Sequence, residues 1–320
     1  MKNKTKIWII VATCLVVIGV TIFAATMSAN GWNFNLLATN NYVTNTHDIK
    51  EEFKNISIDI DTADITFKLD NANQPRIECF DEENVKYSVL VADDTLKISL
   101  VDNRKWYEHI GINFENSKIT IYLPKEEYAV LSIKTNTSDI EIPKEFKFDN
   151  ADISVSTGDV NLLCTALDFI KIKSTTGDIC VQDIEAKMLD VSVSTGKIIA
   201  ENISCVNDVK MSVDTGKASL KNVSCQNLVS NGNTGDLILQ NVIAKEKFSL
   251  ERNTGDIKFE ACDANELLIK TDTGDIKGTL LNDKIFITNS DTGSIDVPKT
   301  TVGGKCEVTT DTGDINLSIK

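Results

Sequence analysis

The chain has 320 residues, 42% of them hydrophobic and 6% aromatic, and its 47 acidic and 33 basic side chains give a net charge of −14 at pH 7. So acidic a surface repels nucleic acids and anionic lipid headgroups, which argues against nucleic acid as a partner. Two histidines leave almost nothing from which to build a histidine-based catalytic triad or a histidine metal cluster.

The first predicted element is a transmembrane helix over residues 7–27. This segment is apolar apart from threonines and one cysteine, and no charged residue lies between Lys6 and Asp48. About 20 helical residues cross the roughly 30 Å hydrocarbon layer of a bilayer. Three lysines precede the segment, so the positive-inside rule places residues 1–6 in the cytoplasm and the bulk of the chain outside the cell. The sequence therefore predicts a single-pass protein of the cell membrane.

A cleaved signal peptide is the alternative for the same segment. It shares the basic start, but its apolar core is shorter, about 7 to 15 residues, and it ends at a small-x-small site. Ala24, Ala25, Ser28 and Ala29 match such a site poorly, so an uncleaved anchor is favoured. Without the three leading lysines the chain has 30 basic and 47 acidic side chains, which leaves the exported part with a net charge of −17.

After a polar linker at 28–49, the sequence predicts an irregular β region over residues 50–133. Short runs of β-branched and alternating apolar residues indicate strands, but the runs do not recur at a fixed spacing. The predicted strands cover 56–60, 65–69, 77–80, 87–91, 96–100 and 119–123. We expect this region to cap the membrane-proximal end of the remaining chain, residues 134–320, because a bare sheet edge presents unpaired backbone groups.

Internal repetition dominates residues 134–320. Apolar residues there alternate with a period of two, without helical periodicity, and a Thr-Gly pair recurs every 19 or 20 residues. The glycines of these pairs are Gly158, Gly177, Gly196, Gly216, Gly235, Gly255, Gly274, Gly293 and Gly313. The predicted fold is all-β: a β-solenoid of 19–20-residue coils, each with three short strands. The nine glycines mark eight intervals, and stacking at about 4.8 Å per coil makes a rod about 40 Å long.

The same alternation predicts which side chains face the core. For two successive coils the inward residues are Ile198, Ala200, Ile203, Cys205, Val209, Met211 and Val213, then Ala218, Leu220, Val223, Cys225, Leu228 and, less well, Ser230. Cys262 and Cys306 also fall on inward positions, whereas Cys180 falls on an outward one and is a candidate free thiol. A disulfide between Cys205 and Cys225 is allowed by distance, but parallel neighbouring strands give poor disulfide geometry.

Each turn contains a glycine because glycine adopts a positive φ at little cost. Ser138 and Ala63 occupy the corresponding positions of two earlier, weaker versions of the turn, so the backbone there is either different or strained. The S-T-G-D and D-T-G-D-I turns behind one N-terminal membrane span resemble the bacterial putative-adhesin family of β-strand-repeat envelope proteins. The resemblance covers residues 56–320. It implies a β-repeat architecture on the envelope of Gram-positive bacteria, a link to envelope-stress systems, and no catalytic residues.

An acidic column is expected along the turns, because aspartate follows most of the glycines. Stacked carboxylates about 4.8 Å apart repel by roughly 1 kcal/mol each even in water. Solvent and lysines such as Lys258 and Lys277 are one source of relief. Bound calcium is the other, with candidate ligands at Asp272, Asp275, Asp291, Asp311 and Asp314. Paired aspartates that cleave glycosides are a further interpretation, but acids at every turn are a structural pattern.

One aromatic segment stands out in the irregular region. Trp106, Tyr107 and His109 form either a loop that packs on the rod or a candidate site for a glycan or protein partner. His47 is expected to be a solvated residue of the linker.

The sequence therefore predicts a non-enzymatic, membrane-anchored adhesin or envelope scaffold without a cofactor, which binds a cell-wall polymer, an envelope protein or its own kind. Since the chain stops seven residues after Gly313, we expect no second cap at the far end, which favours self-association or another partner. An envelope-stress sensor or regulatory subunit that acts with a membrane partner is the alternative, and a carbohydrate-active enzyme is third.

Overall fold

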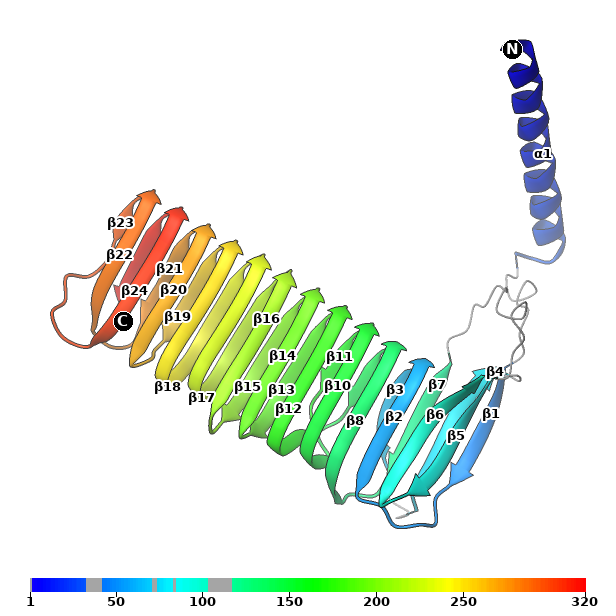
Figure 1. Cartoon of the computed structure of the whole chain (residues 1–320), viewed down its shortest axis with the longest axis horizontal. Helices are drawn as coiled ribbons and strands as arrows, with labels where there is room; N and C mark the ends of the chain where they lie inside the picture. The colour runs from blue at the N-terminus through cyan, green and yellow to red at the C-terminus, as the bar shows by residue number, and fades with distance from the viewer. Residues whose placement is uncertain (1, 33–41, 71–73, 83–84, 103–116) are drawn as a thin grey trace.

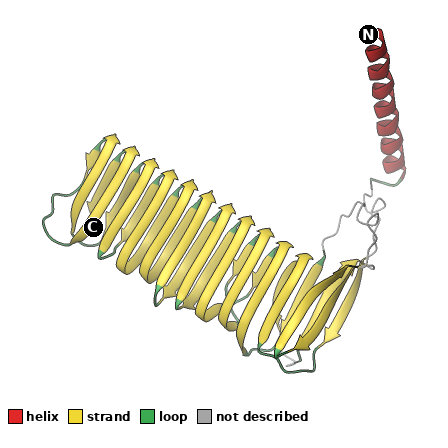
Figure 2. Ribbon diagram, viewed as in Figure 1, coloured by secondary structure: helices red, strands yellow, loops and turns green. Residues whose placement is uncertain are grey.

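A helix and a long rod of stacked β-strands make up the described part of the chain (Figures 1 and 2). Helix α1 (Lys2–Ala29) includes the predicted span, and its stretch Thr5–Ala29 is apolar and long enough to cross a membrane, with a mean hydropathy of 2.7. The helix precedes β1 in the chain, so the end of the rod that contains β1 is called proximal and the opposite end distal. The computed structural model describes residues 2–32, 42–70, 74–82, 85–102 and 117–320.

The proximal end combines antiparallel and parallel strands. β1 runs antiparallel to β4, β4 to β7, and β5 to β6, whereas β2 pairs in parallel with both β6 and β8. These strands are β1 (Tyr42–Asp48), β2 (Asn55–Thr62), β3 (Asp64–Leu69), β4 (Arg76–Glu82), β5 (Val85–Ala92), β6 (Thr95–Asp102) and β7 (Lys118–Leu123). The expected linker thus ends in a strand, and His47 is a half-buried residue of β1 opposite Ile77 rather than a solvated linker residue.

The rest of the rod is made of parallel strands that follow one another in coils. They are β8 (Glu127–Thr137), β9 (Ile140–Ile142), β10 (Lys147–Thr157), β11 (Val160–Leu162), β12 (Thr165–Thr176), β13 (Ile179–Ala186), β14 (Met188–Thr195), β15 (Ile198–Cys205), β16 (Asp208–Thr215), β17 (Ala218–Thr234), β18 (Leu237–Thr254), β19 (Ile257–Cys262), β20 (Glu266–Thr273), β21 (Ile276–Leu280), β22 (Lys284–Thr292), β23 (Ile295–Asp296), β24 (Gly304–Thr312) and β25 (Ile315–Ile319). Together they form the predicted β-solenoid, with about ten turns.

A single coil shows how the sequence turns back on itself. Strand β14 ends at Thr195, Gly196 makes the turn, and β15 begins two residues later. β15 then bends at Asn202, which has a left-handed φ of 56°. The bend divides β15, so each such coil has three straight segments although it holds two continuous strands. Two turn devices therefore shape the coil, the glycine turn and a left-handed residue six positions after it.

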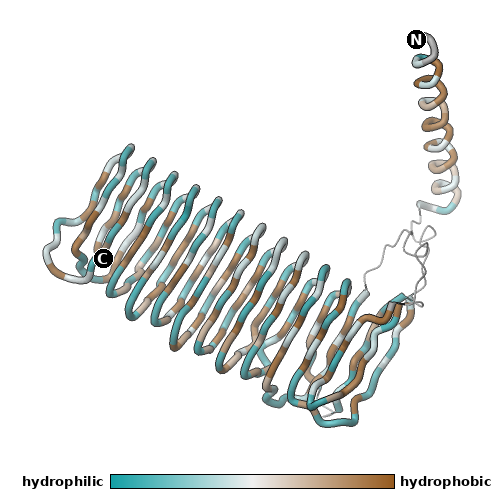
Figure 3. The backbone as a smooth tube through the Cα atoms, viewed as in Figure 1, coloured by the Kyte–Doolittle hydropathy of each residue, from teal (hydrophilic) through white to brown (hydrophobic). Residues whose placement is uncertain are grey.

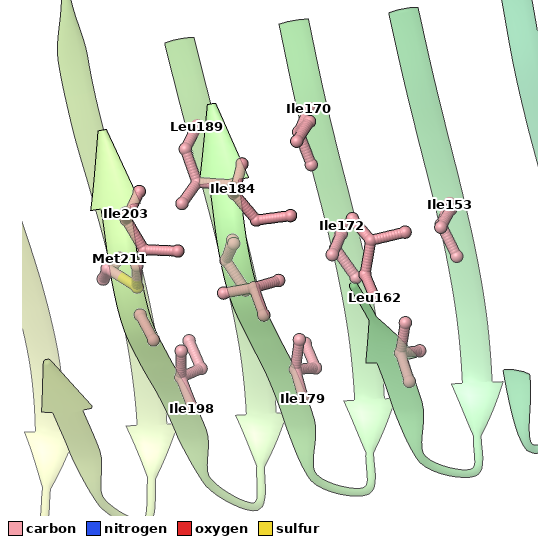
Figure 4. Packing of buried hydrophobic residues seen from close by; sticks show 14 of the residues in the cluster. Ile153, Leu162, Ile170, Ile172, Ile179, Ile184, Leu189, Ile198, Ile203 and Met211 are labelled. Carbon is pink, nitrogen blue, oxygen red and sulfur yellow. The ribbon is translucent and has the colours of Figure 1, made fainter. Parts of the chain in front are cut away.

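The core is one continuous apolar column inside the rod. The predicted inward residues of the two sample coils are all buried, including Ser230 at 0% exposure. Isoleucine, leucine and valine side chains of successive coils lie over one another, as Ile179 lies beside Ile198 in Figure 4. Apolar and polar residues alternate along the tube in Figure 3. Each buried aliphatic side chain contributes about 1.5 to 3 kcal/mol, which a single coil cannot gain alone.

The turn glycines form a column, the glycine column, in which no side chain fits. Their φ values lie between 125° and 155°. A Cβ built on Gly216 would lie 1.8 Å from the carbonyl oxygen of Gly196, and the other members meet the same obstacle at 1.9 to 2.3 Å. Ser138 and Ala63 are not among the positive-φ residues. The backbone at these two earlier positions is therefore different rather than strained.

The coils do not stack in the order of the chain at either end. At the proximal end β2 and β3 lie between β6–β7 and β8–β9. Part of the expected irregular region is therefore a coil of the rod, and the expected boundary at residue 133 falls inside β8. At the distal end β24 and β25 lie between β20–β21 and β22–β23. Residues 284–303, the terminal coil, thus form the far end, where the sequence predicts the C-terminal coil.

Candidate functional site

The predicted acidic column exists, and backbone amides hold it together. The amide of Asp159 donates to Oδ1 of Asp139 at 2.8 Å, and the amide of Asp178 donates to Oδ1 of Asp159 at 2.7 Å. The same bond recurs from the amide of Asp275 to Asp256 and from the amide of Asp314 to Asp275, at 2.9 Å each. Each of these carboxylates thus accepts a hydrogen bond from the next coil. This bond, which the sequence does not predict, reduces the carboxylate repulsion.

Lysines supply the second part of the relief, as expected. Lys258 Nζ lies 2.8 Å from Asp256 Oδ2, and Lys277 Nζ lies 2.7 Å from Asp275 Oδ2. The lysine hydrogen bonds, followed by the amide hydrogen bonds, lower the pKa of Asp256 and Asp275. The pKa of Asp314 is lowered as well, through its hydrogen bonds from the amide and hydroxyl of Ser294. These three carboxylates of the column are therefore ionised, and hydrogen bonds within the rod satisfy them.

The five calcium candidates lie in two adjacent columns at the distal turns. Asp275 and Asp314 belong to the acidic column, whereas Asp272 is paired with Lys270 at 3.2 Å and Asp291 accepts from Asn289 at 3.1 Å. Within the described ranges, no three His, Cys, Asp or Glu side chains lie together in a way that could hold a metal ion. Calcium binding here stays a prediction that needs its own measurement.

A second ladder follows the left-handed bends. The side-chain amide of Asn202 donates to Asp183 at 2.8 Å, that of Asn222 donates to Asn202 at 2.9 Å, and that of Asn241 donates to Asn222 at 2.9 Å. All four residues have φ between 53° and 56°. The first three border a shallow groove of about 430 Å³ that Ser204 and other residues complete. The signal was present in the sequence, since each of the four stands six residues after a turn glycine.

A larger cavity of about 540 Å³ lies at the proximal end. Residues 49–54 and 126–128 line it, together with Gln74, Pro75, Asp94 and Pro124. Phe53 and Tyr128 stack in its wall with ring centres 6.0 Å apart, but both rings are more than nine-tenths buried. Its accessible lining is therefore a mixture of lysine and glutamate side chains rather than an aromatic platform. The aromatic candidates Trp106, Tyr107 and His109 lie outside the described residues.

The cysteines form no disulfides, and those of the rod supply no reactive thiolates. All eight are free, including Cys205 and Cys225. Burial raises the pKa of the Cys164 and Cys205 thiols to about 12, so both are neutral at physiological pH. Cys180, predicted to face outward, is half-buried, and burial raises its pKa as well. The thiols of the rod therefore act as small apolar side chains.

Two charged side chains are buried in the distal half of the rod. Lys284 of the terminal coil is 3% exposed, and its Nζ lies 2.6 Å from Oδ1 of Asp263. Arg252 is 1% exposed and donates to Ser230 Oγ at 3.0 Å and to the carbonyl of Glu251 at 2.7 Å. Burial lowers the pKa of Arg252 to about 10.

The terminal coil is the least covered part of the rod. Ile276, Ile315 and Ile295 occupy one core column in successive coils, and their exposures are 0%, 1% and 44%. On the outer face of β22, Ile285 and Ile287 are 44% and 51% exposed. The distal end therefore presents apolar side chains to solvent beside the free edge of a strand.

Comparison with known proteins identifies the family. The chain belongs to the Toastrack DUF4097 family, whose model matches residues 53–212 and 204–320, and this match confirms the resemblance drawn from the repeated turns. No curated protein matches the chain. Among solved structures it is similar to a "putative adhesin" from Bacteroides fragilis, with 16% identity, 88% of this chain and 99% of that chain covered, and a TM-score of 0.44. It is also similar to a "putative adhesin" from Parabacteroides merdae, with 13% identity, 75% of this chain and 97% of that chain covered, and a TM-score of 0.38. For a "putative lipid binding protein" from Parabacteroides distasonis the identity is 13%, the coverage is 87% of this chain and 98% of that chain, and the TM-score is 0.35.

Proposed function

We propose that the chain is a non-enzymatic adhesin-like scaffold that α1 anchors in the cell membrane of a Gram-positive bacterium, with the rod outside the cell. The observation that carries this proposal is that the chain enters the rod from α1 at the proximal end, whereas an exposed apolar cluster lies at the distal end. The apolar helix joins the proximal end, and the exposed isoleucines of the terminal coil lie at the distal end (Figure 1). Exposed apolar clusters on a soluble body are characteristic of interaction surfaces.

The length of the rod supports the same role. About ten coils at about 4.8 Å give a body about 50 Å long, which would hold its distal end well clear of a bilayer surface. The outer surface of the rod also suits a position outside the cell, because the acidic column and the asparagine ladder satisfy the polar side chains of successive turns with hydrogen bonds. The lysines that precede the apolar stretch of α1 support an orientation with the N-terminus in the cytoplasm.

A retention experiment tests the proposal. The full chain, reconstituted in lipid nanodiscs, is immobilised and exposed to cell-wall polymer fractions, to solubilised envelope proteins and to the chain itself. The scaffold function predicts saturable retention of at least one of the three. The same discs carrying an Ile285→Asp and Ile287→Asp double variant separate binding by the distal end from binding by the sides. If none of the three is retained, the adhesin-like function is wrong.

A further inference from the structure

A lysine and an aspartate are buried together near the distal end of the rod. Lys284 begins β22 and is 3% exposed, and Asp263, which lies between β19 and β20, is 8% exposed. Nζ of Lys284 lies 2.6 Å from Oδ1 of Asp263. The side-chain amide of Asn282 donates to Oδ2 of the same carboxylate, and the backbone amide of Ala264 donates to Oδ1 at 2.9 Å. One buried carboxylate thus receives an ammonium group and two amide donors.

The two side chains come from coils that are not neighbours in the stack. β24 lies between β20 and β22, and Lys284 stands opposite Gly304, the first residue of β24. The lysine therefore reaches past one coil to Asp263, across two layer spacings of about 4.8 Å each. A bond between these two side chains would join the terminal coil to the coil of β20 and hold the C-terminal coil, residues 304–320, between them.

The contact has the geometry and the surroundings that a condensation needs. A nitrogen 2.6 Å from Oδ1 is at most about 3.8 Å from Cγ, because the carbon–oxygen bond adds about 1.2 Å. Reacting atoms in a near-attack arrangement are about 3 to 3.5 Å apart. Burial penalises charged forms and so favours transfer of a proton from the ammonium to the carboxylate, which leaves a nucleophilic amine beside a carboxylic acid. It also keeps out the water that would hydrolyse the product.

We infer that Lys284 and Asp263 condense into an isopeptide bond, and that their ion pair is the state before the reaction. Nζ attacks Cγ, the Nζ–Cγ bond forms, and the Cγ–Oδ1 bond breaks. Two protons pass from Nζ to Oδ1, which leaves as water, so an ammonium and a carboxylate become one neutral amide without a further reactant. Asn282 donates to Oδ2, where negative charge develops in the tetrahedral intermediate, and acts as an oxyanion donor.

The bond fastens the coil that has the fewest partners. Among the described residues β22 pairs with β24 alone, so the terminal coil depends on one strand pairing and on side-chain contacts. The amide replaces two buried charges and removes the cost of keeping an ion pair out of water. Loss of Lys284 removes this fastening in either state. The inference goes beyond the proposed function and does not depend on it, since a cross-linked rod need not bind a partner.

Mass spectrometry of the full chain, purified in detergent and then denatured, tests the inference. The chain is expected to weigh one water, about 18 Da, less than its sequence requires. After tryptic digestion, residues 259–270 and 278–299 should be recovered as one joined species, because trypsin cuts after lysines with a free amine and Lys284 no longer has one. Lys221 and Glu201 are the internal control. Their Nζ–Oε1 distance is also 2.6 Å, but the lysine is half exposed, so this pair should remain unlinked.

Lys284→Arg is the matched variant. It keeps the buried positive charge, but a guanidinium stays protonated and is no nucleophile, so the variant should show no mass loss. If this variant does not fold, the peptide map of the natural chain still decides the question.

Three results would overturn the inference. The first is a natural chain of full mass that trypsin cleaves after Lys284, and the second is a mass loss that persists in Lys284→Arg. The third is loss of ammonia, about 17 Da, with Lys284 joined to Asn282 instead of Asp263. None of these results bears on retention of a wall polymer or envelope protein, so the proposed function stands or falls separately.

Discussion

The two ends of the rod are finished in different ways. At the proximal end β4 and β5 run antiparallel to their neighbours, and β1 adds a further antiparallel strand. Tyr87 of β5 is 4% exposed and donates its hydroxyl to the carbonyl of Thr62, which ties the antiparallel layer to the coil beside it. At the distal end every pairing is parallel, and the last coil has the same direction as the coils before it.

This difference shows how a repeat protein stops growing at one end and remains able to continue at the other. An antiparallel strand breaks the parallel repeat, so a further coil does not fit over it. A parallel terminal coil keeps the repeat and its free edge. Two contacts with the preceding part of the rod hold the terminal coil in place. Lys284 forms a buried ion pair with Asp263, and the hydroxyl of Ser290 donates to the carbonyl of Gly313 at 2.9 Å.

The largest effect is expected in the glycine column, where the middle of the rod and its distal end should respond differently. Gly216→Ala places a Cβ 1.8 Å from the backbone oxygen of Gly196 at a φ of 137°, so we expect a loss of about 4 kcal/mol or more in unfolding free energy. Gly293→Ala meets the same kind of clash at 2.0 Å, but the terminal coil can detach and relieve it. Denaturant unfolding of both variants checks this, and equal losses would contradict the distinction between the two positions.

Breaking the buried ion pair should loosen the distal end selectively. Lys284→Met leaves the carboxylate of Asp263 buried without its cation, which is expected to cost about 3 kcal/mol. Lys258→Met removes a half-exposed lysine from Asp256 and is the control, with an expected cost below about 1 kcal/mol. Chemical denaturation gives both values. A loss for Lys258→Met as large as that for Lys284→Met would show that burial does not determine the difference.

Replacement of Arg252 is expected to raise the free energy of unfolding rather than lower it. Its guanidinium is buried near Ser230, and its two observed hydrogen bonds go to neutral groups. Arg252→Met keeps most of the length of the side chain and removes the buried charge, so unfolding free energy should rise by about 1 kcal/mol. Thermal unfolding measures the change. A marked fall in the midpoint would mean that the charge stabilises the distal coils.

Acid should weaken the turns of the acidic column before it reaches the apolar core. The pKa values of Asp256 and Asp275 are lower in the folded rod than in the unfolded chain, so the unfolded chain binds more protons in acid. Their contribution is fully present above the ordinary carboxyl range and is lost as the pH falls through the lowered values. Stability measured from pH 6 to pH 2 should fall less for an Asp256→Asn and Asp275→Asn variant than for the natural chain.

Calcium is expected to have the smallest effect. Amides and lysines already bond the carboxylates of the acidic column, so chelation should leave the unfolding midpoint unchanged. Differential scanning calorimetry with calcium and with a chelator compares the two conditions. A calcium-dependent rise of several degrees, lost in an Asp272→Asn and Asp311→Asn variant, would establish a site at the distal turns.

The sequence predicts the repeat well because the coil is a local object. Spacing of the glycines and alternation of residues such as Ile198 and Ala200 determine the turn and the buried face within one coil. The order of the coils is not local. Gly303 and Gly304 let the chain pass close to the backbone of Asp283 and Asn265 on its way between two coils, but nothing in the 19-residue period indicates which coil will be last. The hydrogen bonds from backbone amides to the carboxylates of the acidic column could not be predicted from the sequence either, because they depend on the register between coils.

Hydrogen–deuterium exchange in the full chain tests the open distal end most directly. At low concentration the amides of β22 are predicted to exchange much faster than those of β24, although β24 is closer to the C-terminus, because β24 lies between two strands and β22 pairs on one side. Fast exchange in β24 with strong protection of β22 at all concentrations would mean that the coils stack in chain order, and would contradict the account.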